Sequence, residues 1–188
     1  MASAEPAHAF ENLLAATRAE LWRDPDLAVL APDKREEACR AMLISGRTTA
    51  GVFAAAWARA EATVRARVQG PAAQIEAAFA TGLLGNRRSR STADPLFGPA
   101  IDGYCGAQPA LWSGLLPWGQ FRTAELFSDG YVAPPADVSI AAWEAHVRHM
   151  NATDPHRVGA FPAVKGAAPG GHHDDRTVII LRDWRFRA

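Results

Sequence analysis

The sequence predicts a mainly α-helical α+β protein, and three features of its 188 residues lead to this class. Apolar residues recur at helical spacing through the first 85 residues, and glycine or proline separates the repeats. Residues 95–135 are rich in glycine, proline and aromatic side chains, which excludes long regular elements there. An aliphatic run near the end of the chain is typical of a strand. We therefore expect an N-terminal antiparallel helical layer and a loop-rich C-terminal part with one helix and a small antiparallel sheet.

Four amphipathic helices are expected within residues 1–85. Proline suits the first turn of a helix and glycine suits the residue after its last turn, so these residues mark the boundaries. The expected helices run from Pro6 to the break at Asp24 and Pro25, from Pro32 to Gly46, from a cap at Thr48 or Thr49 to Gly70, and from Pro71 to Gly85. Short connections between such helices favour antiparallel neighbours.

The C-terminal part is expected to contain one long helix and one clear strand. Ser139 can cap a helix over residues 140–151, because its hydroxyl can accept a hydrogen bond from a first-turn amide. Residues 177–186 have the strongest strand pattern, and residues 160–165 are the expected hairpin partner across a glycine-rich loop. A short helix is also expected over residues 109–116.

We expect residues 1–188 to fold as a single domain, with a helical layer over residues 1–85 and a loop-rich α+β part over residues 86–188. A chain of this length can bury a sizeable core. The second part has too little regular structure to fold alone. Two cysteines do not make a disulfide framework, and Cys39 lies on an apolar helical stripe, where we expect it in the core.

The composition is that of an ordinary globular protein, with 48% hydrophobic and 21% charged residues. The formal net charge is zero, so neither nucleic acid nor a membrane surface is an expected partner. No run of 18 apolar residues and no signal peptide is visible, which predicts a cytoplasmic protein. Eighteen of the twenty basic residues are arginine and alanine is abundant, as GC-rich bacterial genomes favour.

Five of the six histidines lie in the last quarter of the chain. On a helix, His146 and His149 are neighbours, since they are three residues apart. Together with His172, His173 and Asp174 they could hold a divalent metal such as zinc or iron. The alternative is a set of solvated histidines, because no diagnostic metal-binding spacing is present.

Cys105 is a candidate nucleophile, because it precedes an expected helix whose N-terminus would acidify the thiol. His173, or its neighbour His172, at the start of the strand could act as the base. The alternative is a structural loop residue between glycines. This pattern, like that of the histidines, leaves a catalytic and a structural interpretation open.

Two further stretches could bind a partner. Arginines can clasp phosphates or carboxylates, and clustered aromatic side chains bury much area at low conformational cost. The candidate residues are Arg87, Arg88 and Arg90 in a basic loop, and Trp112, Trp118 and Phe121 in the aromatic segment over residues 112–135. The alternatives are a solvated connection and internal packing. Motifs for nucleotide binding are absent from the sequence.

The leading functional hypothesis is a non-catalytic protein-interaction or assembly subunit of a bacterial complex, which binds another protein through the aromatic segment. A metal-dependent enzyme with the histidine and aspartate site is the first alternative. A cysteine-dependent hydrolase or transferase that uses Cys105 is the second.

Overall fold

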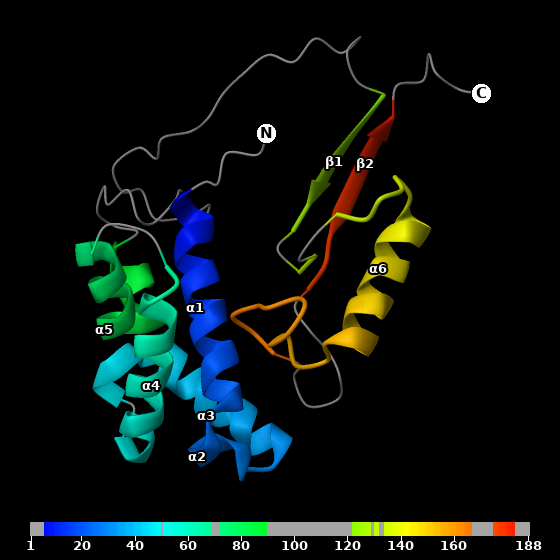
Figure 1. Ribbon diagram of the computed structural model, residues 1–188. Coiled ribbons are helices and arrows are strands. Elements are labelled where there is room, and N and C mark those ends of the chain that lie inside the picture. Colours follow the sequence, from blue (N-terminus) through cyan, green and yellow to red (C-terminus); the bar gives the residue numbers. More distant parts are fainter. Residues whose placement is uncertain are drawn as a thin grey trace. The chain divides into compact units, whose positions relative to one another are not determined.

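The mainly helical α+β class is confirmed by the computed structural model, which describes residues 6–49, 51–68, 72–89, 122–128, 130–131, 134–166 and 175–182. Figure 1 shows the α-helices and the two-stranded antiparallel sheet of this part of the chain. The chain divides into two compact units. The first comprises Met1–Leu111 and Arg157–Gly166, and the second comprises Trp112–His156 and Ala167–Ala188. A single folding domain with subregions 1–85 and 86–188 stays a prediction.

Three of the four helices predicted for the first unit begin at the predicted residue or one residue after it. The elements are α1 (Pro6–Arg23), α2 (Pro25–Ala28), α3 (Pro32–Ser45), the 3₁₀ turns Gly46–Thr49 and Gly51–Phe53, α4 (Ala54–Arg65) and α5 (Ala72–Ser89). Asp24 ends α1 and also caps α2, a short helix that was not predicted, by accepting a 3.0 Å hydrogen bond from the Asp26 amide.

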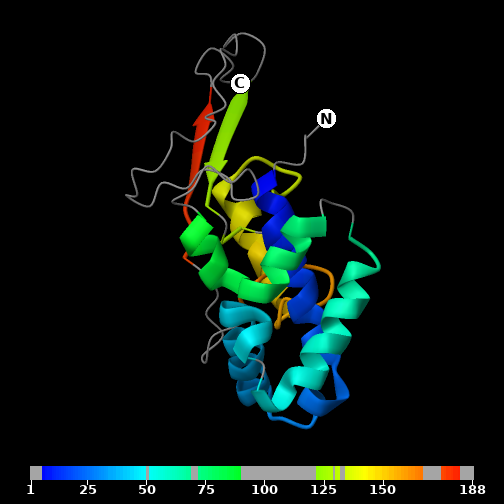
Figure 2. The same ribbon diagram turned by 90° about the vertical axis from the view of Figure 1, so that its left-hand side faces the viewer.

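Two predicted boundaries in this unit are wrong. Helix α4 begins at Ala54, without a threonine cap, because the chain after Gly46 continues through two 3₁₀ turns. Helix α5 does not close at Gly85 but extends to Ser89. It bends at Gly82, whose φ of 55° and ψ of −148° are not helical, and Figure 2 shows the change of direction.

The core of the first unit lies between α1, α3, α4 and α5. Its largest fully buried apolar side chains are Leu14, Leu21, Leu27, Leu43, Trp57, Val64 and Phe79. The rings of Trp57 and Phe79 meet edge to face, with centroids 6.4 Å apart. Cys39 is part of this core, as predicted, and burial raises the pKa of its thiol to about 12. A thiol with such a pKa is not a nucleophile near neutral pH.

Residues Arg157–Gly166, drawn in orange in Figure 1, belong to the first unit. Side chains of α1 and α3 form hydrogen bonds with main-chain groups of this segment. The fully buried Arg18 of α1 donates to the carbonyl oxygen of Arg157 at 3.0 Å, and it pairs with Glu36 of α3. Glu36 in turn accepts a 3.1 Å hydrogen bond from the Gly166 amide. The prediction that residues 160–165 pair with the last strand is therefore wrong.

The second unit contains β1 (Thr123–Phe127), α6 (Ile140–Thr153) and β2 (Val178–Arg182). The two strands are antiparallel, with Glu125 opposite Ile180 at the centre of the register. Ser139 caps α6 as predicted, because its Oγ accepts a 3.0 Å hydrogen bond from the Ala142 amide. We call the two paired strands the β ribbon.

The strand prediction for residues 177–186 is confirmed over Val178–Arg182, and residues 183–186 lie outside the described residues, as does the expected helix over residues 109–116. Among the helices that the structure describes, none has the length and the apolar character needed to cross a membrane.

Candidate functional site

The β ribbon has two different faces. Side chains alternate between the faces of a sheet, so every second residue of each strand lies on the same side. On one face, Glu125 accepts a 2.5 Å hydrogen bond from the indole nitrogen of Trp143 in α6, and the ring centroids of Phe127 and Trp143 are 4.8 Å apart. We call this the inner face. Figure 1 shows α6 running beside the ribbon.

The opposite, outer face is apolar and is exposed. By the alternation, it carries Ala124 and Leu126 from β1, and these residues are paired with Leu181 and Ile179 of β2. The exposed fractions are 55% for Leu126, 53% for Ile179 and 44% for Leu181. Scattered single apolar residues are normal on protein surfaces, whereas these three lie together on a single sheet face and form an exposed apolar patch.

A cluster of aromatic and charged residues holds the inner face. Trp143 is fully buried, and the Tyr131 ring contacts it edge to face at 4.7 Å. The Tyr131 hydroxyl donates to Glu144 at 2.8 Å, and Arg176, just before β2, lies 3.4 Å from the other oxygen of Glu144. Burial and this hydrogen bond raise the pKa of Tyr131. These contacts tie both strands to α6 and keep the outer face in place.

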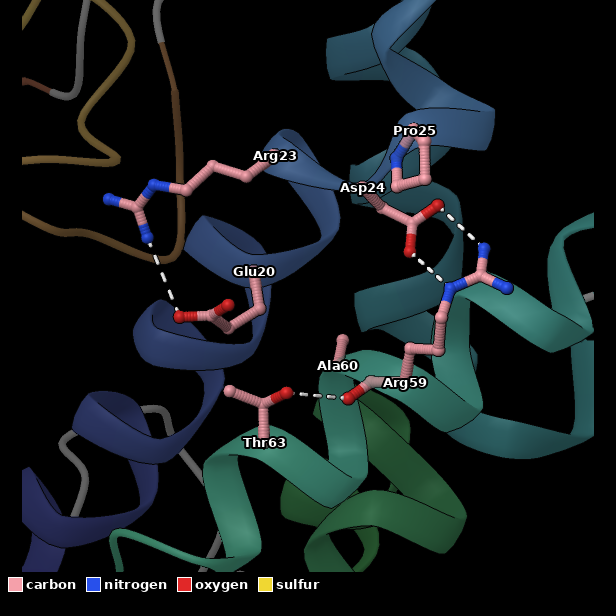
Figure 3. A pocket seen from close by; sticks show the side chains of 7 residues that line it. All are labelled: Glu20, Arg23, Asp24, Pro25, Arg59, Ala60 and Thr63. Atoms are coloured by element: carbon pink, nitrogen blue, oxygen red, sulfur yellow. Dashed lines mark hydrogen bonds and ion pairs between the residues drawn. The ribbon is translucent and has the colours of Figure 1, made fainter.

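The first unit contains a small polar pocket of about 190 Å³ between the end of α1, the start of α2 and α4. Figure 3 shows that its charged side chains are turned toward one another. Arg59 donates two 2.8 Å hydrogen bonds to Asp24, and Glu20 pairs with Arg23 at 3.5 Å and with Arg67 at 2.9 Å. Because each charged group is already neutralised by a neighbour, the pocket offers a ligand no uncompensated charge, and we assign no binding role to it.

Only two of the five residues of the predicted metal site fall in the part of the chain that the structure describes. His146 and His149 lie on α6, as predicted, and Nδ1 of His149 is 3.5 Å from the Thr153 hydroxyl. Among the described residues, no three histidine, cysteine or acidic side chains lie close enough to hold a metal ion. His172, His173 and Asp174 lie outside the described residues. A zinc or iron site therefore stays a prediction.

The other candidate residues are mostly outside the described ranges as well. These are Cys105, Arg90, Trp112, Trp118 and Phe121. Arg87 and Arg88 lie in the last turns of α5, where the structure describes the backbone. The hypotheses of a cysteine nucleophile and of a basic clasp stay predictions.

The strand β1 was not predicted, although it lies inside the aromatic segment that was proposed to bind a partner. Its sequence, Thr-Ala-Glu-Leu-Phe, mixes polar and apolar residues on the inner face, so the alternation is weak. The available signal was a five-residue run between Gly119 and Gly130 with threonine and phenylalanine at its ends. Leu126 was not predicted as a binding residue, because the weak alternation left β1 itself unpredicted.

The sequence and the structure match no protein-family model, no curated protein and no solved structure. The function is therefore inferred from the residues of this chain alone.

Proposed function

We propose that this protein is a non-catalytic interaction or assembly subunit, and that a protein partner docks on the outer face of the β ribbon. The observation that carries the proposal is the group of three exposed apolar side chains, Leu126, Ile179 and Leu181, on one face of a sheet whose other face contacts Trp143 of α6 through Glu125 and Phe127. The face belongs in part to the aromatic segment over residues 112–135, for which the sequence predicts a binding role.

The free energy available from this face sets what the partner must provide. Complete burial of a leucine or isoleucine stabilises by about 1.5–3 kcal/mol, so covering the exposed half of three such side chains contributes about 2–4 kcal/mol. Association costs at least about 4 kcal/mol in lost translational and rotational freedom. The outer face alone is therefore too small, and we propose that Trp112, Trp118 and Phe121 add to the contact.

Photo-crosslinking in the native cells tests this proposal. Ile179 is replaced by the photo-reactive residue p-benzoylphenylalanine, and the adducts are identified by mass spectrometry. The matched control carries the same residue at Ala141, which is exposed on α6 and lies two positions from the buried Trp143, on the other side of the helix. Fractionation of the same cells tests the proposed cytoplasmic location.

The expected result is a discrete protein adduct from position 179 and none from position 141. The adduct should disappear when Leu126→Glu is added, because a carboxylate cannot be buried against an apolar partner. A variant at position 179 that folds and gives only the adducts seen at position 141 would show that the outer face is not a docking surface.

A further inference from the structure

We infer that residues Arg157–Gly166 are an exchangeable strap, which can leave the first unit and be replaced there by the same residues of a second copy of the chain. The place that the strap occupies, which we call the seat, is formed by charged side chains of α1 and α3. This inference concerns a contact within the first unit, so it does not depend on what docks on the β ribbon.

The strap lies in one unit, while the chain on both sides of it lies in the other. His156 and Ala167 belong to the second unit, whereas Arg157–Gly166 belong to the first. The chain therefore leaves the second unit, contributes this segment to the first and returns. An element that crosses between units in this way can be exchanged between two copies with its contacts retained, which is the basis of domain swapping.

Arginine side chains of α1 hold the carbonyl oxygens of the strap. Arg18 donates to the carbonyl oxygen of Arg157 at 3.0 Å and to that of Ala163 at 3.4 Å. Arg23 donates to the carbonyl oxygen of Val158. Because every residue has a carbonyl group, these bonds fix the path of the strap without selecting its sequence.

Selectivity for this sequence comes from a glycine and two valines. The Gly166 amide donates to Glu36 at 3.1 Å, and a Cβ atom at Gly166 would overlap the paired side chains of Arg18 and Glu36. The seat therefore needs a residue without a side chain at this position. Val158 and Val164 pack, partly buried, against the core of the first unit. A second copy of the chain carries the glycine and both valines at the required spacing, so its strap fits the same seat.

The strap is held less firmly than the helices around it. It contains no helix or strand over its ten described residues, and its exposed residues are Gly159, Ala160, Pro162 and Lys165. Ordering such a segment costs conformational entropy, which few contacts offset. Arg157 also has a φ of 53°, a strained value for a residue other than glycine. Release of the strap relieves this strain, so the strap should open at a lower free energy than the core.

Covalent attachment makes the internal strap the stronger competitor for the seat. A short flexible connection gives a tethered segment an effective concentration on the order of millimolar, so wild-type copies at micromolar concentrations should remain closed. Exchange should become visible when the internal contact is impaired. Two variants that each lack one half of the contact therefore provide the test.

Sedimentation velocity of two complementary variants tests the exchange. Arg18→Met has an impaired seat and an intact strap, whereas Gly166→Val has an intact seat and an impaired strap. Each variant alone should be monomeric at micromolar concentrations. An equimolar mixture should form a heterodimer in which the strap of Arg18→Met fills the seat of Gly166→Val. The mixture should associate at least roughly tenfold more tightly than either variant alone, because only the mixture contains a complete buried ion pair and strap.

The matched control for the mixture is the double variant that carries both Arg18→Met and Gly166→Val. It offers neither an intact seat nor an intact strap, so it should not associate with Arg18→Met. Circular dichroism shows whether each protein is folded. If Gly166→Val is not folded, Gly166→Ala takes its place, since a Cβ atom alone already overlaps the seat.

A peptide gives a second test, which does not require Arg18→Met to fold. The peptide has the sequence of residues 157–166 and a fluorescent label, and its binding to the full chain is measured by anisotropy. It should bind Gly166→Val at least roughly tenfold more tightly than the wild type, whose own strap occupies the seat. Ala160→Val, which adds the same side chain at an exposed position of the strap, should bind as weakly as the wild type.

The outcomes either support or overturn the exchange. A heterodimer in the mixture, together with a peptide that loses its affinity for Gly166→Val when its last glycine is replaced by valine, supports it. A mixture of folded variants that stays monomeric overturns it, as does a peptide that binds the wild type and Gly166→Val equally. Crosslinking from position 179 is a separate measurement, so failure of the exchange leaves the proposed docking function standing.

Discussion

Gly46 and Gly82 bring the backbones of α3 and α5 into direct contact. A Cβ atom at Gly46 would lie 2.6 Å from the carbonyl oxygen of Phe79, and a Cβ atom at Gly82 would lie 2.7 Å from the amide nitrogen of Gly46. Both glycines also have positive φ, 68° and 55°. The bend of α5 and the end of α3 are therefore a single feature, in which two residues without side chains allow the two backbones to approach each other closely.

Replacing either glycine with alanine should destabilise the protein. Gly82→Ala adds the strain of a positive φ, about 1–2 kcal/mol, and an overpacked backbone contact, about 1–3 kcal/mol, so the loss should be about 2–5 kcal/mol in urea unfolding. Gly51→Ala is the matched control, because Gly51 has a φ of 53° and open space around its Cα. The unfolding free energy of Gly51→Ala should fall only by the amount that the positive φ costs. Equal losses of unfolding free energy in Gly82→Ala and Gly51→Ala would show that the close backbone contact at Gly82 does not affect stability.

The buried Arg18 should contribute more to stability than an exposed ion pair of the same kind. Arg18→Met removes the donor to Arg157 and leaves Glu36 without its guanidinium partner, which should cost about 3–5 kcal/mol. Hydrogen exchange of residues 157–166 should rise at the same time. Lys34→Met breaks the exposed pair with Glu37 and should cost less than about 1 kcal/mol. A small effect of Arg18→Met would mean that these residues are held by their apolar side chains.

Acid should destabilise the junction of α1 and α2 through Asp24. Hydrogen bonds from Arg59 hold the pKa of this carboxyl below its ordinary value, although burial opposes the shift. A group whose pKa is lower in the folded state stabilises the protein above its unfolded pKa, near 3.9, and loses that contribution as pH falls through the folded pKa. Asp24→Asn keeps an oxygen that can cap α2 but has no charge. The unfolding free energy of this variant should fall less steeply than that of the wild type below about pH 4; parallel curves would contradict the assignment.

The inner face of the ribbon should depend on the hydrogen bond between Glu125 and Trp143. Glu125→Ala leaves the buried indole nitrogen without this acceptor, which should cost about 1–3 kcal/mol and change the near-ultraviolet circular dichroism. Glu125→Gln retains an acceptor oxygen and should cost less. If the two substitutions have the same effect, the contact between Phe127 and Trp143 holds the strand without help from the carboxylate.

The buried Arg18 shows which part of a polar contact the sequence predicts and which part it does not. Arg18 lies four residues after Leu14 and three before Leu21, so it occupies the apolar stripe of α1. A charged residue at such a position predicts a buried partner, although spacing alone does not identify it. The partner, Glu36, and the accepting carbonyl of Arg157 are 18 and 139 residues away, and only the packing of α1 against α3 reveals them.

Strand pairing is the clearest case in which local patterns were insufficient. The aliphatic run of β2 predicts a strand, but several segments at similar distances along the chain could pair with it, and the entropy of closing a loop changes slowly with loop length. Residues 160–165 were excluded because Arg18 and Glu36 bind the main chain around them. Thr123–Phe127 pairs with β2, and this pairing is stabilised because Phe127 and Glu125 contact Trp143 on α6.

The sequence by itself determined the four long helices of the first unit except for the start of α4 and the end of α5, the capped helix α6 and the strand β2, because the spacing of apolar residues, proline, glycine and a capping serine acts over a few neighbouring residues. Only the tertiary structure decided that α5 bends at Gly82, that β2 pairs with β1 and that Leu126, Ile179 and Leu181 share an uncovered face. These features depend on contacts between residues that are distant along the chain, and the free energy of such contacts appears in no local pattern.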